Sequence, residues 1–315
     1  MIMAKRILAF FLAVLLLVVS LSSCADIAEK NDDGVFRIAC TSYPVASWLG
    51  EITKGVFDKL EIIFLFDEGK DMHNYQPTSR DMINIASSDL VVYTGGTSDK
   101  WVEDALESSI PKTVTSVRLM NYINDVHCDE GCLEEGNEHD HDGDEHIWLS
   151  LENAKVCVDK LSEVISMLYK SGEEKIKANS ENYIKALDEL REKYLLAVEN
   201  AKHKTLVFAD RFPFVYLVEE LGLEYSAAFP GCSSDTTASF ETVISLAKKI
   251  DENGLSAVVV IEGSDTKIAE TVIANTRDKN AKIVELDSMQ IWDGESSGYL
   301  KRMEKNLEAL TVALN

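Results

Sequence analysis

Residues 173–201, EEKIKANSENYIKALDELREKYLLAVENA, predict one long amphipathic helix in the middle of the chain. At 1.5 Å per residue such a helix spans roughly 40 Å. That length exceeds what one small domain needs, and it suits a rigid connection between two lobes. Its larger apolar residues recur at the spacing of a single helical face; they are Tyr183, Ile184, Leu187, Leu190, Tyr194, Leu195 and Val198.

On both sides of this helix, short β-branched segments alternate with amphipathic ones. Alternation of this kind is typical of α/β layers built around parallel sheets. Strands are expected at 36–40, 60–66, 90–93, 113–117, 205–209, 224–228, 257–261 and 282–286. Helices are expected at 44–53, 78–86, 100–107, 151–169, 237–251, 266–276 and 297–314. The sequence therefore predicts an α/β protein with two parallel-sheet lobes, at 35–172 and 202–315, joined by the helix 173–201.

The first residues have the pattern of a secretory signal. Two basic residues precede an apolar run at 7–19 that is too short to span a bilayer comfortably. The run ends in LSSC, residues 21–24, which resembles the bacterial lipobox, where cleavage leaves a lipidated cysteine at the new N-terminus. We therefore expect a signal peptide at 1–23, a lipid on Cys24, a polar tether at 24–34, and a location at the extracytoplasmic face of the cell membrane. The alternative is a cleaved, secreted protein in which Cys24 is incidental.

The chain is strongly acidic. Its formal net charge is −23, and loss of the two basic residues of the signal makes it −25. A field of that sign repels nucleic acid and anionic lipid surfaces, and it raises the local concentration of cations. Nucleic acid is therefore not an expected partner, whereas a divalent metal ion is a compatible one.

The cysteines do not decide the function. With Cys24 assigned to the lipid, five of the six remain, and an odd number leaves at least one unpaired within the chain. Cys128 and Cys132 lie close together in a polar loop, where they could form a disulfide or join a metal site.

The polar loop at 124–145 holds histidines and carboxylates in close succession. His127, His139 and His141 lie in it and His146 follows it, so four of the six histidines fall within twenty positions. Imidazole and carboxylate are the ligand types that zinc and neighbouring transition metals favour. An acidic loop alone would be a solvated surface excursion, but the histidines favour metal affinity. We interpret the loop as a weak collecting segment, separate from one rigid primary site.

Two histidines adjoin ordered elements. His146 begins an apolar segment at 147–150, and His73 lies between the second expected strand and the next helix. In open α/β sheets, ligands bind beyond the carboxyl ends of the strands, which is where His73 is expected. A single histidine of this kind is more often structural. The pairing of two, both at the ends of elements, favours a metal site.

The residues around both histidines resemble the motifs of a known family. Residues 72–78, MHNYQPT, resemble the His-x-Tyr-x-Pro-[Ser/Thr] motif of the metal-binding proteins that serve zinc and manganese ABC transporters. Residues 144–150, DEHIWLS, resemble their Asp-x-His-[Ile/Val]-Trp-Leu segment, and residues 42–44 and 88–96 fit the same family. The resemblance, which covers nearly the whole mature chain, implies two α/β lobes joined by a rigid helix, with metal in the cleft between them. It also implies a binding protein, not an enzyme, that delivers metal to an ABC permease; we expect a monomer.

The resemblance also implies metal ligands, His73 and His146 in the first lobe and two more in the second. The family's third ligand is usually a His or Glu at the end of the first strand of the second lobe. Counting forward from that strand gives Asp210 here, whereas counting back from Tyr216 gives Arg211, whose guanidinium cannot deprotonate to bind metal. We favour Asp210, with a turn or cap role as the alternative.

The family's fourth ligand, commonly an Asp after a late strand, matches Asp287. The alternative for Asp287 is a cap or turn role, and Glu262, which also follows a buried strand, is a reserve ligand. Two imidazoles with two carboxylates suit Zn²⁺ in tetrahedral form, although oxygen-rich sites also admit Mn²⁺. The histidine-rich loop favours zinc, and a manganese-specific binding protein is the alternative within the family.

Two other classes of protein are compatible with parts of this pattern. A zinc-dependent hydrolase would use three protein ligands and an open fourth position to activate water, but the chain contains no His-Glu-x-x-His pair. A surface adhesin could have the same fold, but the sequence displays no feature that indicates one. We therefore predict no catalytic residue.

Overall fold

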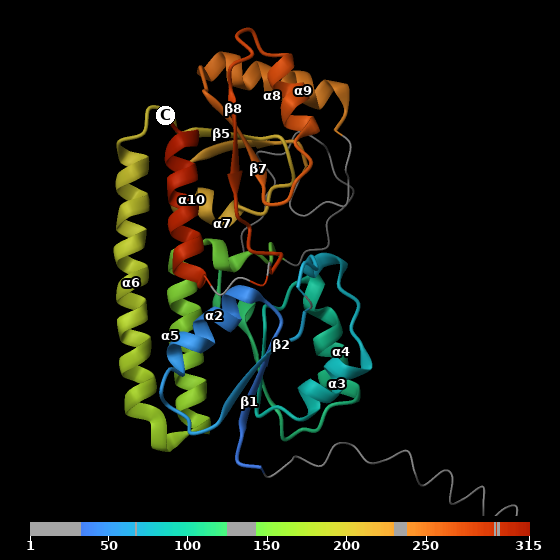
Figure 1. The fold of residues 1–315 in the computed structure, drawn as a ribbon, viewed down its shortest axis with the longest axis vertical. Helices are drawn as coiled ribbons and strands as arrows, with labels where there is room; N and C mark the ends of the chain where they lie inside the picture. Colours follow the sequence, from blue (N-terminus) through green and yellow to red (C-terminus); the bar gives the residue numbers. More distant parts are fainter. Residues whose placement is uncertain (1–32, 67, 125–142, 230–237, 293, 295–296) are drawn as a thin grey trace, which may run out of the picture.

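The computed structural model of the chain describes residues 33–66, 68–124, 143–229, 238–292, 294 and 297–315. Cys24, His127, His139 and His141 lie outside the described residues. Two α/β lobes lie one above the other, and long helices run beside them (Figure 1). The expected fold, two parallel-sheet lobes with a long connecting helix, is confirmed.

The first lobe contains a four-stranded sheet with the order β2-β1-β3-β4, in which all neighbouring strands are parallel. The central strand β3 is buried at all four positions, as expected for a sheet covered on both faces. Because parallel strands end at the same edge, the loops that follow them gather there. The elements are β1 (Phe36–Cys40), α2 (Tyr43–Ile52), β2 (Leu60–Phe64), α3 (Ser79–Ala86), β3 (Leu90–Tyr93), α4 (Lys100–Ser108) and β4 (Thr115–Arg118).

The second lobe repeats this architecture, with the parallel order β6-β5-β7-β8. The carboxyl end of β8 points toward the first lobe, and that of β1 points toward the second, so the two loop-bearing edges face each other (Figure 1). The elements are β5 (Thr205–Phe208), α7 (Val215–Glu220), β6 (Glu224–Ala227), α8 (Phe240–Asn253), β7 (Ala257–Ile261), α9 (Lys267–Ala274), β8 (Lys282–Leu286) and α10 (Tyr299–Ala313).

Two long helices connect the lobes. α5 (Leu151–Leu168) and α6 (Glu173–Glu199) pack side by side, and α6 extends along both lobes (Figure 1). With 27 residues, α6 spans about 40 Å. Two residues of the predicted apolar stripe were placed wrongly, since Ile184 is only half-buried and Leu195 is exposed. The buried face carries Ile176, Ser180, Tyr183, Leu187, Leu190, Tyr194 and Val198. Among the described helices, none is long and apolar enough to cross a membrane.

Capping groups set some helix ends that the sequence pattern predicted only approximately. α8 begins at Phe240 rather than near 237, because the Ser239 side chain accepts a hydrogen bond from Thr242 N (3.0 Å). It ends where Gly254 adopts a left-handed conformation with φ 62°. The last strand of the first lobe is also displaced, since it begins at Thr115 rather than at 113.

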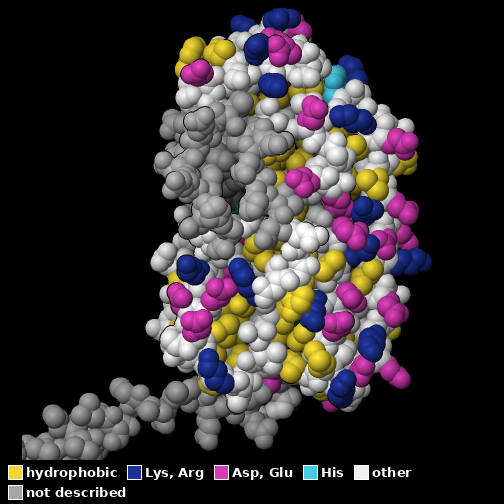
Figure 2. Space-filling view, turned by 180° about the vertical axis from the view of Figure 1, so that it is seen from behind, with side chains coloured by type: hydrophobic (Ala, Val, Ile, Leu, Met, Phe, Trp, Pro, Cys, Tyr) yellow, Lys and Arg dark blue, Asp and Glu magenta, His cyan; other side chains and the backbone are white. Residues whose placement is uncertain are grey.

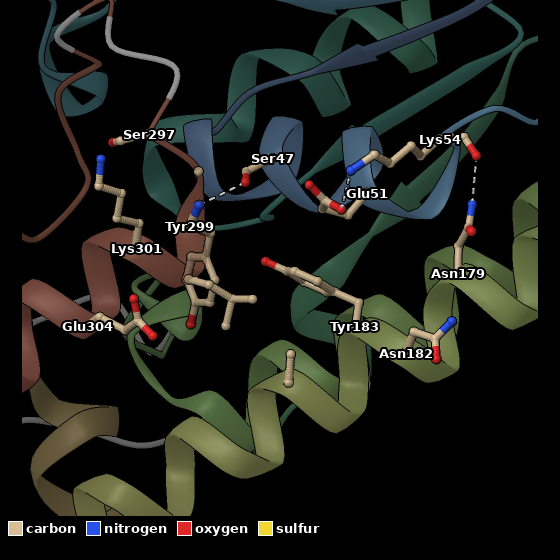
Figure 3. Close-up of a pocket in the computed structure, with 13 residues that line it drawn as sticks. Ser47, Glu51, Lys54, Asn179, Asn182, Tyr183, Ser297, Tyr299, Lys301 and Glu304 are labelled. Atoms are coloured by element: carbon tan, nitrogen blue, oxygen red, sulfur yellow. Dashed lines mark hydrogen bonds and ion pairs between the residues drawn. The ribbon is translucent and has the colours of Figure 1, made fainter.

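Buried hydrogen bonds also connect the lobes directly. Trp148 Nε1 donates to Ser288 O beyond β8 (2.8 Å), and Tyr299 Oη of α10 donates to Trp148 O (2.6 Å). Tyr299 N donates to Ser47 Oγ of α2 (2.9 Å), beside a surface pocket of about 610 Å³ between α2, α6 and α10 (Figure 3). The two lobes are therefore held against each other as well as joined through α6.

Charged side chains of both signs share the surface. On the face shown in Figure 2, acidic and basic side chains are interspersed over the described residues. Side chains of opposite charge also form ion pairs one helical turn apart. On α6, for example, Lys177 Nζ lies 2.7 Å from Glu173 Oε1. The acidic excess is thus not gathered into one patch on the face of Figure 2.

Candidate metal centre

His73 lies in a 3₁₀ turn, Met72–Asn74 (η1), between β2 and α3. The Asp71 side chain caps the turn by accepting a hydrogen bond from His73 N (3.0 Å). On the other side, Tyr75 Oη donates to Asp81 Oδ2 (2.7 Å), and Asp81 belongs to a capping box at the start of α3. The motif around His73 therefore fixes the turn at both ends and orients the imidazole.

His146 is fixed by neighbours in its own segment. It precedes a second 3₁₀ turn, Ile147–Leu149 (η4), and is 2% exposed. Asp144 Oδ1 lies 2.8 Å from His146 N and 2.7 Å from His146 Nδ1, and it accepts from both. The Trp148 ring packs edge-on against the imidazole, with ring centroids 5.3 Å apart. The segment therefore directs His146 Nε2 away from Asp144.

The imidazoles of His73 and His146 face each other through their Nε2 atoms, which lie 3.2 Å apart. The side-chain amide of Gln290 joins them, with its Nε2 3.0 Å from His146 Nε2. Zinc–nitrogen bonds of about 2.0–2.1 Å place two ligands of a tetrahedral ion roughly 3.3 Å apart. The separations found here are close to that value, so the three groups surround a position that could take a metal ion.

Each imidazole also has a carboxylate at its other ring nitrogen. Glu145 Oε1 lies 3.0 Å from His73 Nδ1 and also accepts from Ser98 Oγ (2.7 Å), and Asp144 is the corresponding partner of His146. Burial raises the pKa of Glu145, but the hydrogen bond from His73 and the charges of both histidines outweigh it and hold the pKa at about 2. Glu145 is therefore ionised at neutral pH and, together with Ser98 Oγ, which lies 2.7 Å from His73 Nδ1, favours the His73 proton on Nδ1.

This arrangement decides which nitrogen of each ring faces the site. When Nδ1 of His73 and of His146 donates to a carboxylate, Nε2 carries a lone pair. With a lone pair on each Nε2, the two atoms, 3.2 Å apart, can both bind a cation placed between them. Metal-binding histidines are usually oriented by carboxylates in this way. The chemistry of the donor set therefore fits a metal ion.

Two glycines after β3 provide space for neighbouring side chains, Gly96 for Glu145 and Gly95 for Arg118. A Cβ atom at Gly96 would lie 2.3 Å from Glu145 Oε2, too close for any side chain to be accommodated without a shift. Gly95 has a φ of 102°, and a Cβ there would collide with the Arg118 side chain. Gly96, within residues 88–96, thus allows the carboxylate that orients His73 to reach its place.

Asp210 lies at the carboxyl end of β5 and has two backbone partners. Its Oδ1 accepts from Arg211 N (2.8 Å), and its Oδ2 accepts from Ile261 N at the end of β7 (3.2 Å). The Arg211 side chain reaches the first lobe, where its Nη1 lies 3.2 Å from Asp71 Oδ2. Asp210 therefore ties the ends of two strands together, and both of its carboxylate oxygens already accept a backbone hydrogen bond.

Asp287 follows β8 and is paired with a basic residue. Its Oδ2 accepts from Arg302 Nη1 of α10 (2.9 Å), and its Oδ1 accepts from Met289 N (2.8 Å). The Arg302 side chain is 5% exposed and also lies over the Tyr43 ring. Both carboxylate oxygens of Asp287 therefore already accept a hydrogen bond, one of them from a buried guanidinium.

Glu262, at the carboxyl end of β7, accepts from Ser288 N (2.7 Å) and Ser288 Oγ (2.6 Å). Burial and the charge of Asp287 raise its pKa to about 7. In the part of the chain that the structure describes, no three His, Cys, Asp or Glu residues form a group that could hold a metal ion. The structure thus brings His73 and His146 together, but not with the carboxylates of the second lobe.

Gln290 is a site residue that the sequence analysis missed. It comes three residues after Asp287, but an uncharged amide is not a preferred zinc ligand. It is 4% exposed, and rotation of its amide by 180° would present Oε1, an acceptor able to bind a cation, at the same place. Only its position beyond β8 could have indicated a role at the site.

Comparison with known proteins relates the whole chain to zinc-uptake proteins. The sequence model of the family described as zinc-uptake complex component A, periplasmic (ZnuA), matches residues 38–313. Zinc-binding protein AdcA of Streptococcus pyogenes serotype M1 is 28% identical over 295 residues, which cover 89% of this chain and 56% of AdcA. High-affinity zinc uptake system protein ZnuA of Bacillus subtilis is 27% identical over 306 residues, which cover 93% of this chain and 92% of that protein. The chain therefore spans little more than half of the length of AdcA.

A solved structure has the same fold. The crystal structure of the metal-dependent lipoprotein YcdH from Bacillus subtilis matches with a TM-score of 0.73 at 24% sequence identity. The match covers 89% of this chain and 100% of that chain. At this level of identity the likeness shows the two-lobe fold alone.

Proposed function

The chain belongs to the family of periplasmic zinc-uptake complex component A, and from this premise we propose that it captures a divalent metal ion outside the cytoplasm for import. The observation that carries the proposal is the pair His73 and His146, with Nε2 atoms 3.2 Å apart and a carboxylate at each Nδ1. Zinc is the proposed metal, because paired imidazoles suit it and because the matched relatives are named for zinc binding and zinc uptake.

We propose His73 and His146 as the ligands that receive the ion, with the Gln290 amide beside them. Asp210 and Asp287 are second-lobe candidates, and each already accepts a hydrogen bond, from Ile261 N and from Arg302, respectively. Glu262 is a reserve for the same role. The loop at 124–145, with His127, His139 and His141, is the proposed collecting segment that raises the metal concentration near this site.

Anchoring and delivery complete the proposed function. We propose that Cys24 carries a lipid that holds the protein at the extracytoplasmic face of the membrane, where it passes the ion to an ABC permease. Capture and transfer need no catalytic group, in agreement with names of relatives that describe binding and uptake. Replacing Cys24 by Ala should release the protein into the medium, and retention at the membrane would contradict the anchor.

Native mass spectrometry tests the metal site. The soluble protein without Cys24, purified without chelator, should bind one equivalent of zinc tightly and should bind manganese much more weakly. His73→Ala and His146→Ala should each abolish that equivalent. His203→Ala is the matched control, because His203 follows α6 and its backbone N–H bonds to Leu314 O, at the far end of the second lobe from the site.

The outcomes separate the alternatives. Tight manganese with weak zinc would favour the manganese-specific alternative, and no tight metal in either titration would refute capture altogether. A zinc-dependent hydrolase would instead turn over ester or peptide substrates with the metal bound. Delivery is tested by growth: a deletion strain should fail at low zinc, and a gene carrying His73→Ala should not restore it.

A further inference from the structure

Arg211 occupies the position where counting within the family's motif places a ligand, yet it cannot bind metal. Its side chain instead crosses from the second lobe to the first, where Nη1 lies 3.2 Å from Asp71 Oδ2. The side chains are only 25% and 15% exposed, so the pair is partly shielded from solvent. The ion pair joins the two lobes, and Asp71 is only two residues from His73. We therefore examine a role in the metal site rather than surface charge pairing alone.

The Asp71 carboxylate serves both lobes at once. While Oδ2 accepts from Arg211, Oδ1 accepts from His73 N and caps the turn that carries the imidazole. The Asp71 backbone forms an antiparallel bridge with Ile291, the residue after Gln290. Asp71 therefore connects the turn of His73 both to Arg211 and to the segment that brings Gln290 to the site.

The backbone of Arg211 is held in place by the neighbouring Asp210. Asp210 accepts its backbone N–H through Oδ1 and joins it to the end of β7 through Ile261 N. Asp210 thus ties the backbone of Arg211 to the end of β7, and the Arg211 guanidinium contacts Asp71. The chain of contacts runs from β7 through Arg211 and Asp71 to His73.

We propose that Arg211 is a positioning residue for the metal site: through Asp71 it holds the turn of His73 in the geometry that receives the ion. This inference rests on the proposed function, because it concerns how the same site is kept in shape. Its consequence is that the orientation of the second lobe contributes to zinc affinity although Arg211 binds no metal. Partners that orient metal-binding groups commonly contribute about 10- to 100-fold in metal affinity.

The direction in which Arg211→Ala changes zinc affinity distinguishes this positioning role from simple electrostatic repulsion. A guanidinium near a divalent cation repels it, so if charge alone mattered, Arg211→Ala would tighten zinc binding. A positioning role predicts the opposite, about tenfold weaker binding with faster zinc release to a chelator. Arg211→Lys, which keeps the charge and part of the reach to Asp71, should recover some of the lost affinity.

A double-mutant comparison tests whether Arg211 acts through Asp71. Asp71→Asn keeps an oxygen for His73 N but loses the ion pair, so it should weaken zinc binding to a similar extent. The double variant should then bind no more weakly than the weaker single variant. Tighter or unchanged binding in Arg211→Ala, or losses that multiply in the double variant, would overturn the inference.

A matched control tests whether general destabilisation of the protein could explain weaker zinc binding in Arg211→Ala. Arg37→Ala breaks another ion pair of a partly buried arginine, with Glu61 (3.0 Å), near the amino ends of β1 and β2 and thus away from the carboxyl edge of that sheet. It should lower the melting temperature of the metal-free protein while leaving zinc affinity unchanged. One zinc equivalent in the wild type tests the proposed function separately, so failure of either idea can be recognised.

Discussion

The Nε2 atoms of His73 and His146 lie 3.2 Å apart, although 73 positions separate the two residues in the chain. Both follow elements of the first lobe, so the pair is complete within that lobe. The second lobe adds the Gln290 amide, 3.0 Å from His146 Nε2, from the segment beyond β8. Capture can therefore begin at two fixed imidazoles, with the second lobe completing the surroundings of the ion.

Replacing Glu145 by Gln tests the carboxylate that orients His73. The variant keeps the size of the side chain but removes the charge that holds the proton on His73 Nδ1. We expect zinc affinity to fall by about 10- to 100-fold, as is usual when such a partner is lost. Competition with a chromogenic chelator measures it. Glu103→Gln, which affects a pair with Arg118 in the same lobe, is the control and should leave affinity unchanged; equal affinities in the two variants would contradict the role.

Two substitutions at Gln290 test whether its amide contacts the ion. Gln290→Glu places an anionic oxygen beside His146 Nε2, and zinc favours carboxylate oxygen over a neutral amide. We expect binding to tighten about tenfold, equivalent to about 1.4 kcal/mol, and to weaken in Gln290→Ala. Isothermal titration calorimetry with zinc measures both. If neither variant differs from the wild type, Gln290 packs beside the site without contacting the ion.

Much of the fold could be predicted because its signals are local and periodic. The apolar stripe from Tyr183 to Val198 predicts α6, and the alternation around it predicts two parallel sheets. The proximity of His73 and His146 follows in part from the same logic, because loops at the carboxyl edge of one sheet must gather. Helix and strand ends were less predictable, since they depend on capping groups such as Ser239.

The partners of individual carboxylates could not be predicted. Asp287 lies where the motif places it, but its hydrogen bonds depend on α10 bringing Arg302 alongside. Asp210 likewise depends on how closely β7 brings Ile261 N. The residue type of Gln290 gave no indication that it lies at the metal site. These are tertiary contacts among residues far apart in the chain, and no local pattern encodes them.

Asp287→Ala separates a structural role from a metal-binding one. The substitution leaves the Arg302 guanidinium, 5% exposed, without its carboxylate. We expect the free energy of unfolding of the metal-free protein to fall by about 3 kcal/mol, as when one partner of a buried pair is removed. Zinc affinity should change little, because Asp287 is committed to Arg302 in the structure.

Urea unfolding and zinc titration together check that expectation. Arg277→Ala is the control, because the Arg277 side chain is 80% exposed and its pair with Asp251 has an N–O distance of 3.7 Å, and a pair of that kind contributes at most about 1 kcal/mol. A large loss of zinc affinity in Asp287→Ala, with little loss of stability, would show instead that Asp287 leaves Arg302 and binds the ion.

Glu262 makes the stability of the metal-free protein depend on pH. Burial and the charge of Asp287 raise its pKa from 4.5 to about 7, so the folded state holds a proton that the unfolded state has already lost between these values. Its contribution to stability is fully present below pH 4.5 and is lost as the pH rises through 7. The shift corresponds to up to about 3 kcal/mol.

Urea unfolding of the chelator-treated protein at pH 5 and pH 8, for the wild type and Glu262→Gln, measures this contribution. The variant cannot ionise at position 262, so it should lose less stability than the wild type between the two pH values. Asp99, whose pKa burial and the charge of Glu145 raise to about 6, loses its contribution over part of the same range but is present in both proteins. It therefore cancels in the comparison. Glu145, with a pKa of about 2, contributes in the opposite direction below pH 4.5, outside this window. Parallel losses in the two proteins would mean that Glu262 is already ionised at pH 5 in the folded state.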